Sequence, residues 1–328
     1  MRLLYPIVGV AVLAAASAAW WAFPPEPTSV LRSCQSPLAR VEQAAAPELG
    51  PRIERWRLLD ARGDTVRALW RPAPPEVRAP WTLVLLGGAM TGDRAALLLP
   101  ADLPAHVLAV DWPWSGPRRL SAWSFAREHL AIRSAVLRAP AALALAMEAL
   151  SAEPRVAPSR IALLGASLGV PPALAALALT DSPKALVLIH GAADLEGLVR
   201  HALEGRVRPG ALRAFLAAYV ARLVHPLEPA LHLERAVRVP TLIISAGADE
   251  WLHPSGVAML EAGIPAASIV RHGGGHVLPK QRELIAEISR DVMGWLDRLD
   301  SPHVASEPRA ERILADDLGP HAAGHTRN

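Results

Sequence analysis

Residues 160–169 have the sequence Arg-Ile-Ala-Leu-Leu-Gly-Ala-Ser-Leu-Gly, in which a short apolar run ends in the pattern Gly-x-Ser-x-Gly. An apolar, helix-like stretch follows as far as Leu179. This pattern between a strand and a helix predicts a sharp turn that lifts the serine hydroxyl clear of a sheet. Glycines two residues to either side of Ser167 let the strand and the helix approach closely. Ser167 is therefore the candidate nucleophile, and an ordinary tight turn with an inert serine is the alternative.

Short and almost wholly apolar runs recur on both sides of this turn. Runs that are apolar on both faces are typical of strands buried between two helix layers, as in a parallel sheet. Helical patterns separate them, the longest at 125–150, where Pro140 is predicted to kink or split the helix. The alternation predicts an α/β fold with a doubly wound, mostly parallel sheet of about eight strands. The runs are 81–86, 106–110, 160–164, 185–189, 240–245 and a last strand at 267–271.

The segments outside these runs set the predicted domain boundaries. Two half-apolar runs at 52–59 and 65–71 flank a turn-rich loop and predict an antiparallel hairpin. Extra helical pattern within about 195–237 predicts a cap insert over the pocket. We therefore predict a linker or short helix over 28–51, an α/β domain over 52–300 and a loosely ordered tail over 301–328.

The N-terminus carries an uncharged apolar run from Leu3 to Phe23, preceded by Arg2 and followed by a Pro-rich break. The run is about long enough to span a bilayer. Residues 16–18, Ala-Ser-Ala, also match a signal-peptide cleavage site. Residues 1–27 are therefore predicted to be a membrane anchor or a secretory signal, and a buried helix of the domain is the alternative. Both favoured interpretations predict an exported chain, either anchored in the cell membrane or periplasmic or secreted.

Composition argues against several other classes of function. The formal net charge is +3 and no block of basic residues occurs, so nucleic acid is not an expected partner. Cys34 is the only cysteine in the sequence and can form neither an internal disulfide nor a Cys-based metal site. The sequence contains no His-x-His or His-Glu-x-x-His spacing. We expect neither a metal nor a cofactor.

A nucleophilic serine needs a base, and the base needs a carboxylate that orients it. For a serine in this kind of turn, the acid and then the histidine are expected downstream. Asp249 follows the run 240–245 and is the predicted acid. Glu250 is the alternative, because a difference of one residue in turn geometry decides which carboxylate faces the imidazole.

His276 is the predicted base, since it follows the last strand and three consecutive glycines that let the backbone pass close to the nucleophile. His272 and His253 are the alternatives. His272 is expected to end the strand and to point into the sheet or its flank, and His253 is expected at the rim of the site.

Cleavage of an ester or amide also needs N–H donors for the oxyanion of the tetrahedral intermediate. The backbone N–H of Leu168 is one predicted donor. The second is predicted in the Gly-rich loop 87–93, at Ala89 with Gly88 as the alternative. A phosphate-binding loop is the competing interpretation, but the lysine and Ser/Thr of a P-loop are missing here.

These residues together make the chain resemble the α/β-hydrolase superfamily over about 52–299. The approach 158–164 to the serine turn is similar to the dienelactone-hydrolase and acyl-peptidase-like branches, as are Gly247 and Asp249 before Pro254. The resemblance implies a triad of Ser167, Asp249 and His276 and an acyl-enzyme mechanism. Gly87 is a departure, since the family often has a histidine at that position.

A further similarity to the family is an Asp and a Gly after the fourth strand, matched by Asp111 and Gly116. Trp112 and Trp114 lie between them and are predicted to line an aromatic wall for an acyl or alkoxy group. Buried packing is the alternative role for both rings.

The sequence therefore predicts a serine hydrolase that cleaves a carboxylic ester or a related acyl bond of a small or lipid-like substrate. One alternative is an acyltransferase with the same triad. The other is a catalytically inactive binding protein that is tethered to the membrane.

Overall fold

A computed structural model describes residues 25–88, 91–116 and 122–300 of the chain. The predicted tail over 301–328 lies outside the described residues, as does the predicted anchor or signal segment apart from its last three residues.

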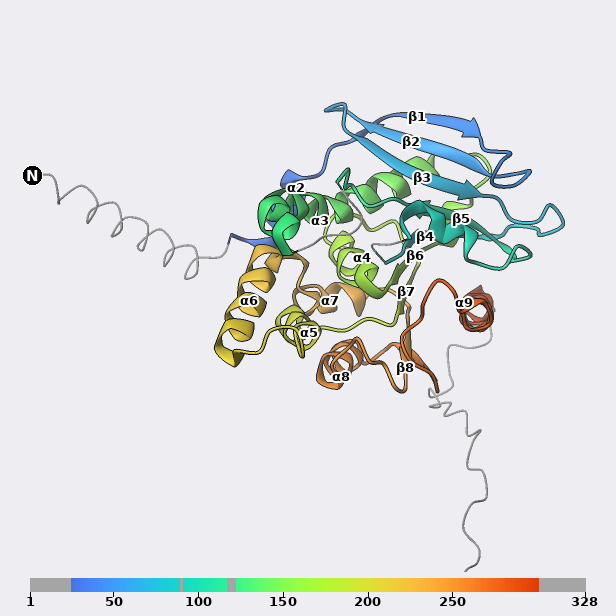
Figure 1. Cartoon of the computed structure of the whole chain (residues 1–328). Coiled ribbons are helices and arrows are strands. Elements are labelled where there is room, and N and C mark those ends of the chain that lie inside the picture. Colours follow the sequence, from blue (N-terminus) through green and yellow to red (C-terminus); the bar gives the residue numbers. More distant parts are fainter. Residues whose placement is uncertain (1–24, 89–90, 117–121, 301–328) are drawn as a thin grey trace, which may run out of the picture.

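Nine strands form a single sheet in the order β1-β2-β3-β5-β4-β6-β7-β8-β9 (Figure 1). Strands β1, β2, β3 and β5 are antiparallel neighbours, and the remaining pairs from β5 to β9 are parallel. The strands are β1 (Leu38–Ala45), β2 (Glu54–Asp60), β3 (Thr65–Arg71), β4 (Trp81–Leu86), β5 (Ala105–Val110), β6 (Ile161–Ala166), β7 (Ala185–Ile189), β8 (Thr241–Ala246) and β9 (Ser268–His272).

The inner strands β4 to β8 are the almost continuous apolar runs of the sequence, and nearly all their residues are buried. Such strands can be buried on both faces because helices cover the sheet on both sides. The mostly parallel sheet is thus confirmed, and β2 and β3 form the predicted antiparallel hairpin.

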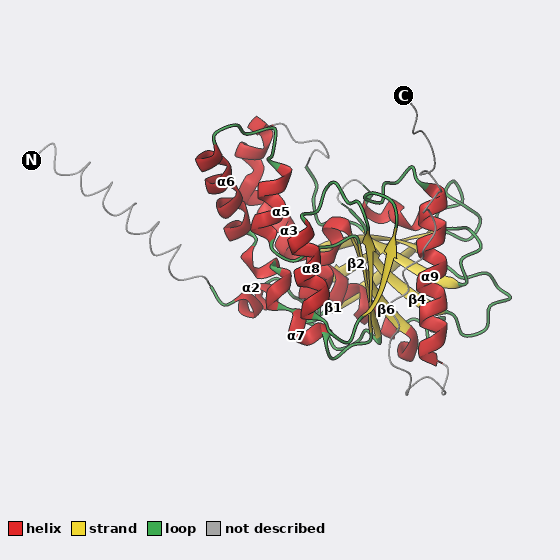
Figure 2. Cartoon of the chain, turned by 90° about the horizontal axis from the view of Figure 1, so that it is seen from below, coloured by secondary structure: helices red, strands yellow, loops and turns green. Residues whose placement is uncertain are grey.

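Helices α3 (Ala122–Ser151) and α8 (Pro254–Gly263) lie on one face of the sheet (Figure 2), and α4 (Val170–Ala176) packs in the same layer. Their apolar side chains, such as Met147, Leu174 and Leu260, belong to one core cluster with β2, β3 and the inner strands. The opposite face is covered by the 3-10 helix η1 (Gly92–Leu97) and by α9 (Arg282–Asp300). The two layers make the sheet doubly wound.

The segment 28–51, predicted as a linker or a short helix, does contain a short helix, but the linker is wrong. This segment contains the helix α2 (Pro27–Ser33) and the edge strand β1, which pairs with β2 and brings the sheet to nine strands. The residues of β1 are all exposed or half-buried, so the strand has no buried apolar face that a sequence pattern would reveal. Backbone pairing with β2 holds it in place.

Pro140 does not split the long helix. Helix α3 continues through it without a break from Ala122 to Ser151. Arg127–Ser151 is the one described helix that is long and apolar enough to cross a bilayer. Of its most apolar window, 56% is buried inside the fold, as is usual for a core helix.

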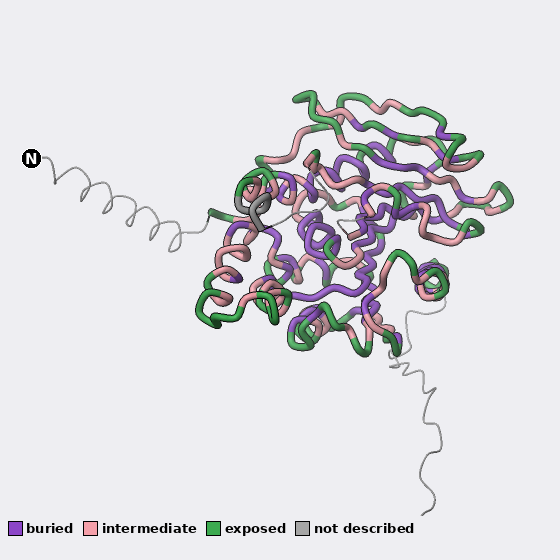
Figure 3. Tube along the Cα trace, viewed as in Figure 1, coloured by how far each residue is buried: buried purple, intermediate pink, exposed green. Residues whose placement is uncertain are grey.

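All secondary structure elements of the insert between β7 and β8 are helices. The insert packs against α3, where the Arg133 Nε donates to the Leu223 carbonyl oxygen at 2.9 Å. Figure 3 shows that buried residues concentrate in the sheet and the helices upon it, whereas α6 is largely half-buried or exposed. The elements are α5 (Leu195–Ala202), α6 (Gly210–Leu223), η4 (His225–Leu227), η5 (Pro229–Leu231) and α7 (Leu233–Ala236).

Candidate active site

Four polar residues lie just beyond the carboxyl ends of four neighbouring parallel strands, along one edge of the sheet. Ser167 follows β6, His190 follows β7, Asp249 lies beyond β8 and His276 lies beyond β9. Because parallel strands end at the same edge, residues that are up to 109 positions apart in sequence become neighbours.

Ser167 lies in a strained turn between β6 and α4. Its φ is 55°, in the left-handed region that non-glycine residues rarely adopt. Glycine is required two residues to either side of Ser167, because neighbouring backbone approaches both positions closely. A Cβ on Gly165 would lie 2.6 Å from the Gly169 carbonyl oxygen, and a Cβ on Gly169 would overlap the Leu86 carbonyl. The turn thus holds the half-buried Ser167 side chain at the edge of the sheet.

The three predicted catalytic side chains are joined by two short hydrogen bonds. The His276 Nε2 lies 2.8 Å from the Ser167 Oγ, and the His276 Nδ1 lies 2.8 Å from the Asp249 Oδ2. His276 is only 3% exposed, and the Asp249 side chain is 5% exposed. This geometry suits a serine O–H that donates to Nε2 and an Nδ1–H that donates to the carboxylate.

The second oxygen of Asp249 is held by the backbone. Its Oδ1 accepts hydrogen bonds from the N–H groups of Trp251 at 2.9 Å and Leu252 at 3.1 Å. Burial acts to raise the pKa of Asp249, but the hydrogen bonds from His276 and Trp251 outweigh it, and the pKa is lowered overall. Asp249 is therefore an anion that faces the imidazole.

Glu250, the alternative acid, contacts a different part of the histidine. Its Oε2 accepts from the backbone N–H of His276 at 3.2 Å. Its own backbone N–H and the N–H of His276 lower the pKa of the Glu250 carboxyl. Glu250 thus supports the loop that carries His276, while Asp249 faces the ring.

The alternative bases lie away from Ser167. His272 ends β9 and turns to the flank of the sheet, where its ring lies 3.2 Å from Glu287 and 3.3 Å from Asp291 on α9. His253 is exposed at the start of α8, and its Nδ1 lies 2.7 Å from the Ser255 Oγ. His272 thus lies on the flank of the sheet, as the sequence predicted, whereas the place of His253 at the rim of the site stays a prediction.

Several solved structures are similar to this chain. Acetyl xylan esterase 1 from Thermoanaerobacterium sp. JW/SL YS485 has a TM-score of 0.58 at 14% identity, with 85% of this chain and 95% of that chain covered. An acetyl xylan esterase from Paenibacillus sp. R4 has a TM-score of 0.56 at 16% identity, with 86% and 98% covered. A puromycin-hydrolyzing peptidase from Mycobacterium tuberculosis has a TM-score of 0.55 at 21% identity, with 78% and 41% covered.

The chain has the α/β-hydrolase fold. It spans about two fifths of the length of the puromycin-hydrolysing enzymes that it matches. No protein-family model and no curated protein matches the sequence. The likeness at these identities concerns the fold, and so the chemistry has to be argued from the site.

The loop after β4, where the second oxyanion donor was predicted, lies beside Ser167. A Cβ on Gly88 would lie 3.9 Å from the Ser167 Cβ. Leu168 follows Ser167 in the turn and is 50% exposed. Ala89, the preferred second donor, lies outside the described residues, and its role stays a prediction.

Trp112 is tied to this loop, because its indole Nε1–H donates to the Gly87 carbonyl oxygen at 3.0 Å. Trp112 and Trp114 both line a cavity of about 510 Å³ between the hairpin β2–β3 and α3. Ser167 and His276 are not among the residues that line it. Contact of either tryptophan with a substrate stays a prediction.

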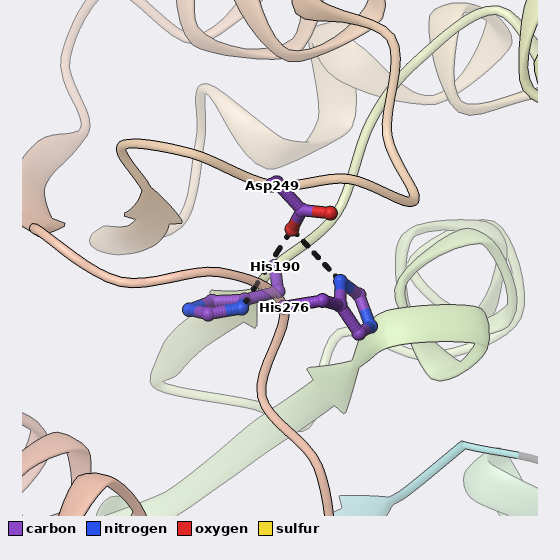
Figure 4. A group of neighbouring side chains, drawn as sticks. All are labelled: His190, Asp249 and His276. Atoms are coloured by element: carbon purple, nitrogen blue, oxygen red, sulfur yellow. Dashed lines mark hydrogen bonds and ion pairs between the residues drawn. The ribbon is translucent and has the colours of Figure 1, made fainter.

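His190, which follows β7, is a member of the site that the sequence did not single out as catalytic. Its side chain is fully buried, and its Nδ1 lies 3.8 Å from the Asp249 Oδ2 (Figure 4). The same Nδ1 accepts from the backbone N–H of Val277 at 2.9 Å, so the proton of this ring is on Nε2. Burial, reinforced by the neighbouring His276, lowers the pKa of His190 to about 4. His190 is therefore neutral and braces the residue that follows His276.

Trp251 is the other residue that the sequence did not single out. Its ring stacks on His276 with centroids 5.1 Å apart and planes within 3°. Trp251 nevertheless remains 55% exposed. The available sequence signal was a tryptophan directly after Asp249 and Glu250. The direction in which its side chain points, however, depends on the turn at Asp249.

His190, Asp249 and His276 each offer a ligand atom, and these atoms lie within 4.8 Å of one another. Both histidine Nδ1 atoms are already engaged in hydrogen bonds, however. The His190 Nδ1 accepts from Val277, and the His276 Nδ1 faces Asp249 at hydrogen-bond distance. A cation would therefore have to break the hydrogen bonds that orient His276, and the cluster suits acid–base chemistry better than metal binding.

Proposed function

We propose that this chain is a serine hydrolase that cleaves a carboxylic ester, or a related acyl bond, of a small or lipid-like substrate. The observation that carries the proposal is the unbroken series of hydrogen bonds from Asp249 through His276 to Ser167. The left-handed backbone of Ser167 supports it, because strained residues of this kind concentrate at reactive sites.

In the proposed reaction, the Ser167 Oγ attacks the acyl carbon while its proton passes to the His276 Nε2. Backbone N–H groups of Leu168 and of the loop after β4 stabilise the oxyanion. The C–O bond to the leaving alcohol then breaks, and the Nε2 returns its proton to the leaving oxygen. A water molecule attacks the acyl-enzyme with His276 as base, which releases the acid and restores the serine.

The electrostatics of Asp249 suit this cycle. The carboxylate stays ionised because its pKa is lowered, so it can stabilise the imidazolium that forms when His276 takes a proton. Neutral His190 adds no positive charge beside that imidazolium.

The structural neighbours named above favour acyl-bond cleavage. Two of them are acetyl xylan esterases and one is a puromycin-hydrolyzing peptidase. At 14–21% identity these names do not transfer to this chain, but they favour esters and amides as the substrate classes to test.

The test is hydrolysis of p-nitrophenyl esters of increasing acyl chain length by the purified chain. Ser167→Ala is expected to lower kcat by about 10⁴-fold or more with at least one ester, because the nucleophile is lost. Ser255→Ala is the matched control, since Ser255 also contacts a histidine but lies at an exposed helix start. Equal activity of wild type and Ser167→Ala would overturn the proposal, as would a folded wild type that cleaves no ester.

We also propose that the N-terminal apolar segment exports the chain and tethers it to a membrane. The support is its sequence alone, an uncharged run of about bilayer length before the α/β domain. The full chain is expected in the membrane fraction, and a chain that starts at residue 25 is expected in the soluble fraction with unchanged ester hydrolysis. A full chain that stays soluble with its N-terminus intact would contradict the tether.

A further inference from the structure

An exposed tryptophan lies directly against the predicted catalytic base. Trp251 is 55% exposed, although one face of its ring is stacked on His276, which is itself only 3% exposed. Exposed single apolar side chains are common, but among the described residues Trp251 is the exposed aromatic ring that is stacked on the predicted base. The described residues therefore leave an aromatic surface open at the edge of the proposed site.

The position of Trp251 is fixed by the same turn that holds the acid. Its backbone N–H donates to the Asp249 Oδ1, and the next residue, Leu252, donates to that oxygen as well and is buried. The helical insert holds the turn from the other side, where the His201 Nε2 lies 3.1 Å from the Glu250 carbonyl oxygen. These contacts fix the backbone of Trp251 and the stacking on His276 holds its ring, which lowers the cost of binding against it.

The chemistry of acyl transfer decides which part of a substrate lies near this ring. The His276 Nε2 has to give its proton to the leaving oxygen, so the leaving group must lie within hydrogen-bond distance of that nitrogen. The acyl oxygen, by contrast, has to face the backbone donors near Leu168 and Gly88. The Trp251 ring is stacked on that imidazole with centroids 5.1 Å apart, so a leaving group that reaches the His276 Nε2 comes close to it.

We propose that Trp251 forms a subsite for the leaving alcohol and that this subsite favours alcohols with a flat or apolar group. The inference rests on the proposed serine hydrolase mechanism and goes beyond it in naming the part of the substrate that is recognised. An aromatic or alicyclic alcohol stacks on the open ring, whereas a methyl or ethyl group is too small to cover it.

The experiment compares benzyl acetate with ethyl acetate, which share an acyl group and differ in the alcohol. In the variant Trp251→Ala, the ratio of kcat/KM for benzyl over ethyl acetate is expected to fall about three- to tenfold, through the loss of one aromatic contact. Trp251→Phe keeps a ring and is expected to retain most of the ratio. Phe215→Ala removes another exposed aromatic side chain, on α6, and is the matched control.

A second pair, ethyl phenylacetate and ethyl acetate, varies the acyl group with a fixed alcohol. Its ratio is expected to change less than twofold in Trp251→Ala. A benzyl-to-ethyl ratio that is unchanged in Trp251→Ala would overturn the subsite while leaving the serine hydrolase intact, and so would a change confined to the acyl pair. A wild type that hydrolyses none of these esters, nor any p-nitrophenyl ester, would overturn both proposals.

Discussion

Asp249 and Glu250 are adjacent in sequence, yet they contact different parts of His276. Asp249 faces the ring Nδ1 and Glu250 accepts from the backbone N–H. We expect Asp249→Asn to lower kcat for an ester by about 10³-fold or more, since an amide favours the wrong tautomer of the histidine. We expect Glu250→Gln to stay within about threefold of wild type, because the amide oxygen still accepts the hydrogen bond. The reverse order of the two variants would assign the acid to Glu250.

His190 gives the fold a pH dependence with a defined sign. Its pKa is about 4 in the folded protein against an ordinary value of 6.5, so between these values the unfolded chain binds the proton more readily. The stabilisation is fully present above pH 6.5 and is lost as the pH falls to about 4, a change of about 3 kcal/mol.

The matched variant for this effect is His190→Asn, whose amide oxygen can replace Nδ1 as the acceptor for Val277. Its free energy of unfolding, from urea titrations at pH 4 to 7, is expected to fall with acid by about 3 kcal/mol less than that of wild type. Buried His106 and His232, whose pKa values burial also lowers, contribute equally to both proteins. Identical slopes for the two proteins would contradict the neutral, buried His190.

The sequence identifies residues whose role depends on local context and misses those whose role depends on packing. Ser167 lies in a recognisable pattern, and Asp249 and His276 each follow a strand signal. His190 also follows a strand, but its contact with Asp249 exists only because β7 lies between β6 and β8 in the sheet. The stacking of Trp251 on His276 likewise depends on a turn that no periodicity encodes.

The loop after β4 depends on a side chain from the loop after β5. The Trp112 indole N–H donates to the Gly87 carbonyl and so fixes the peptide group that carries the Gly88 N–H. We expect Trp112→Phe to lower kcat for an ester about three- to tenfold with KM nearly unchanged, because one hydrogen bond that positions the predicted oxyanion loop is lost. Trp114→Phe is the control from the same cavity, and an equal loss of kcat there would contradict the positioning role.

Prediction of the secondary structure elements succeeds where burial on both faces leaves a continuous apolar run. Strands β4, β6, β7 and β8 all meet this condition. Strand β1 does not, because it lies at the edge of the sheet and its stability comes from backbone pairing with β2. The helix α3 continues past Pro140 because packing against the sheet and its neighbours offsets the missing hydrogen bond.

At the scale of the whole molecule, the order of the strands brings Ser167, Asp249 and His276 together. Neighbouring strands β6 to β9 place loops that are distant in sequence at one edge, and the helices on both faces keep that edge fixed. Neither the strand order nor the packing of the helical insert against α3 follows from the local patterns. The fold class is nevertheless predictable, because only parallel strands between helices account for the alternation of apolar runs.

The proposed mechanism requires that Ser167 reacts covalently with an electrophile that mimics an ester. The full chain is to be incubated with a fluorophosphonate, and the adduct located by mass spectrometry of its peptides. We predict one adduct per chain, on the peptide that contains Ser167, and none in the folded variant His276→Ala at the same exposure time. An adduct on another residue, or an unmodified Ser167 in folded wild type, would contradict the account.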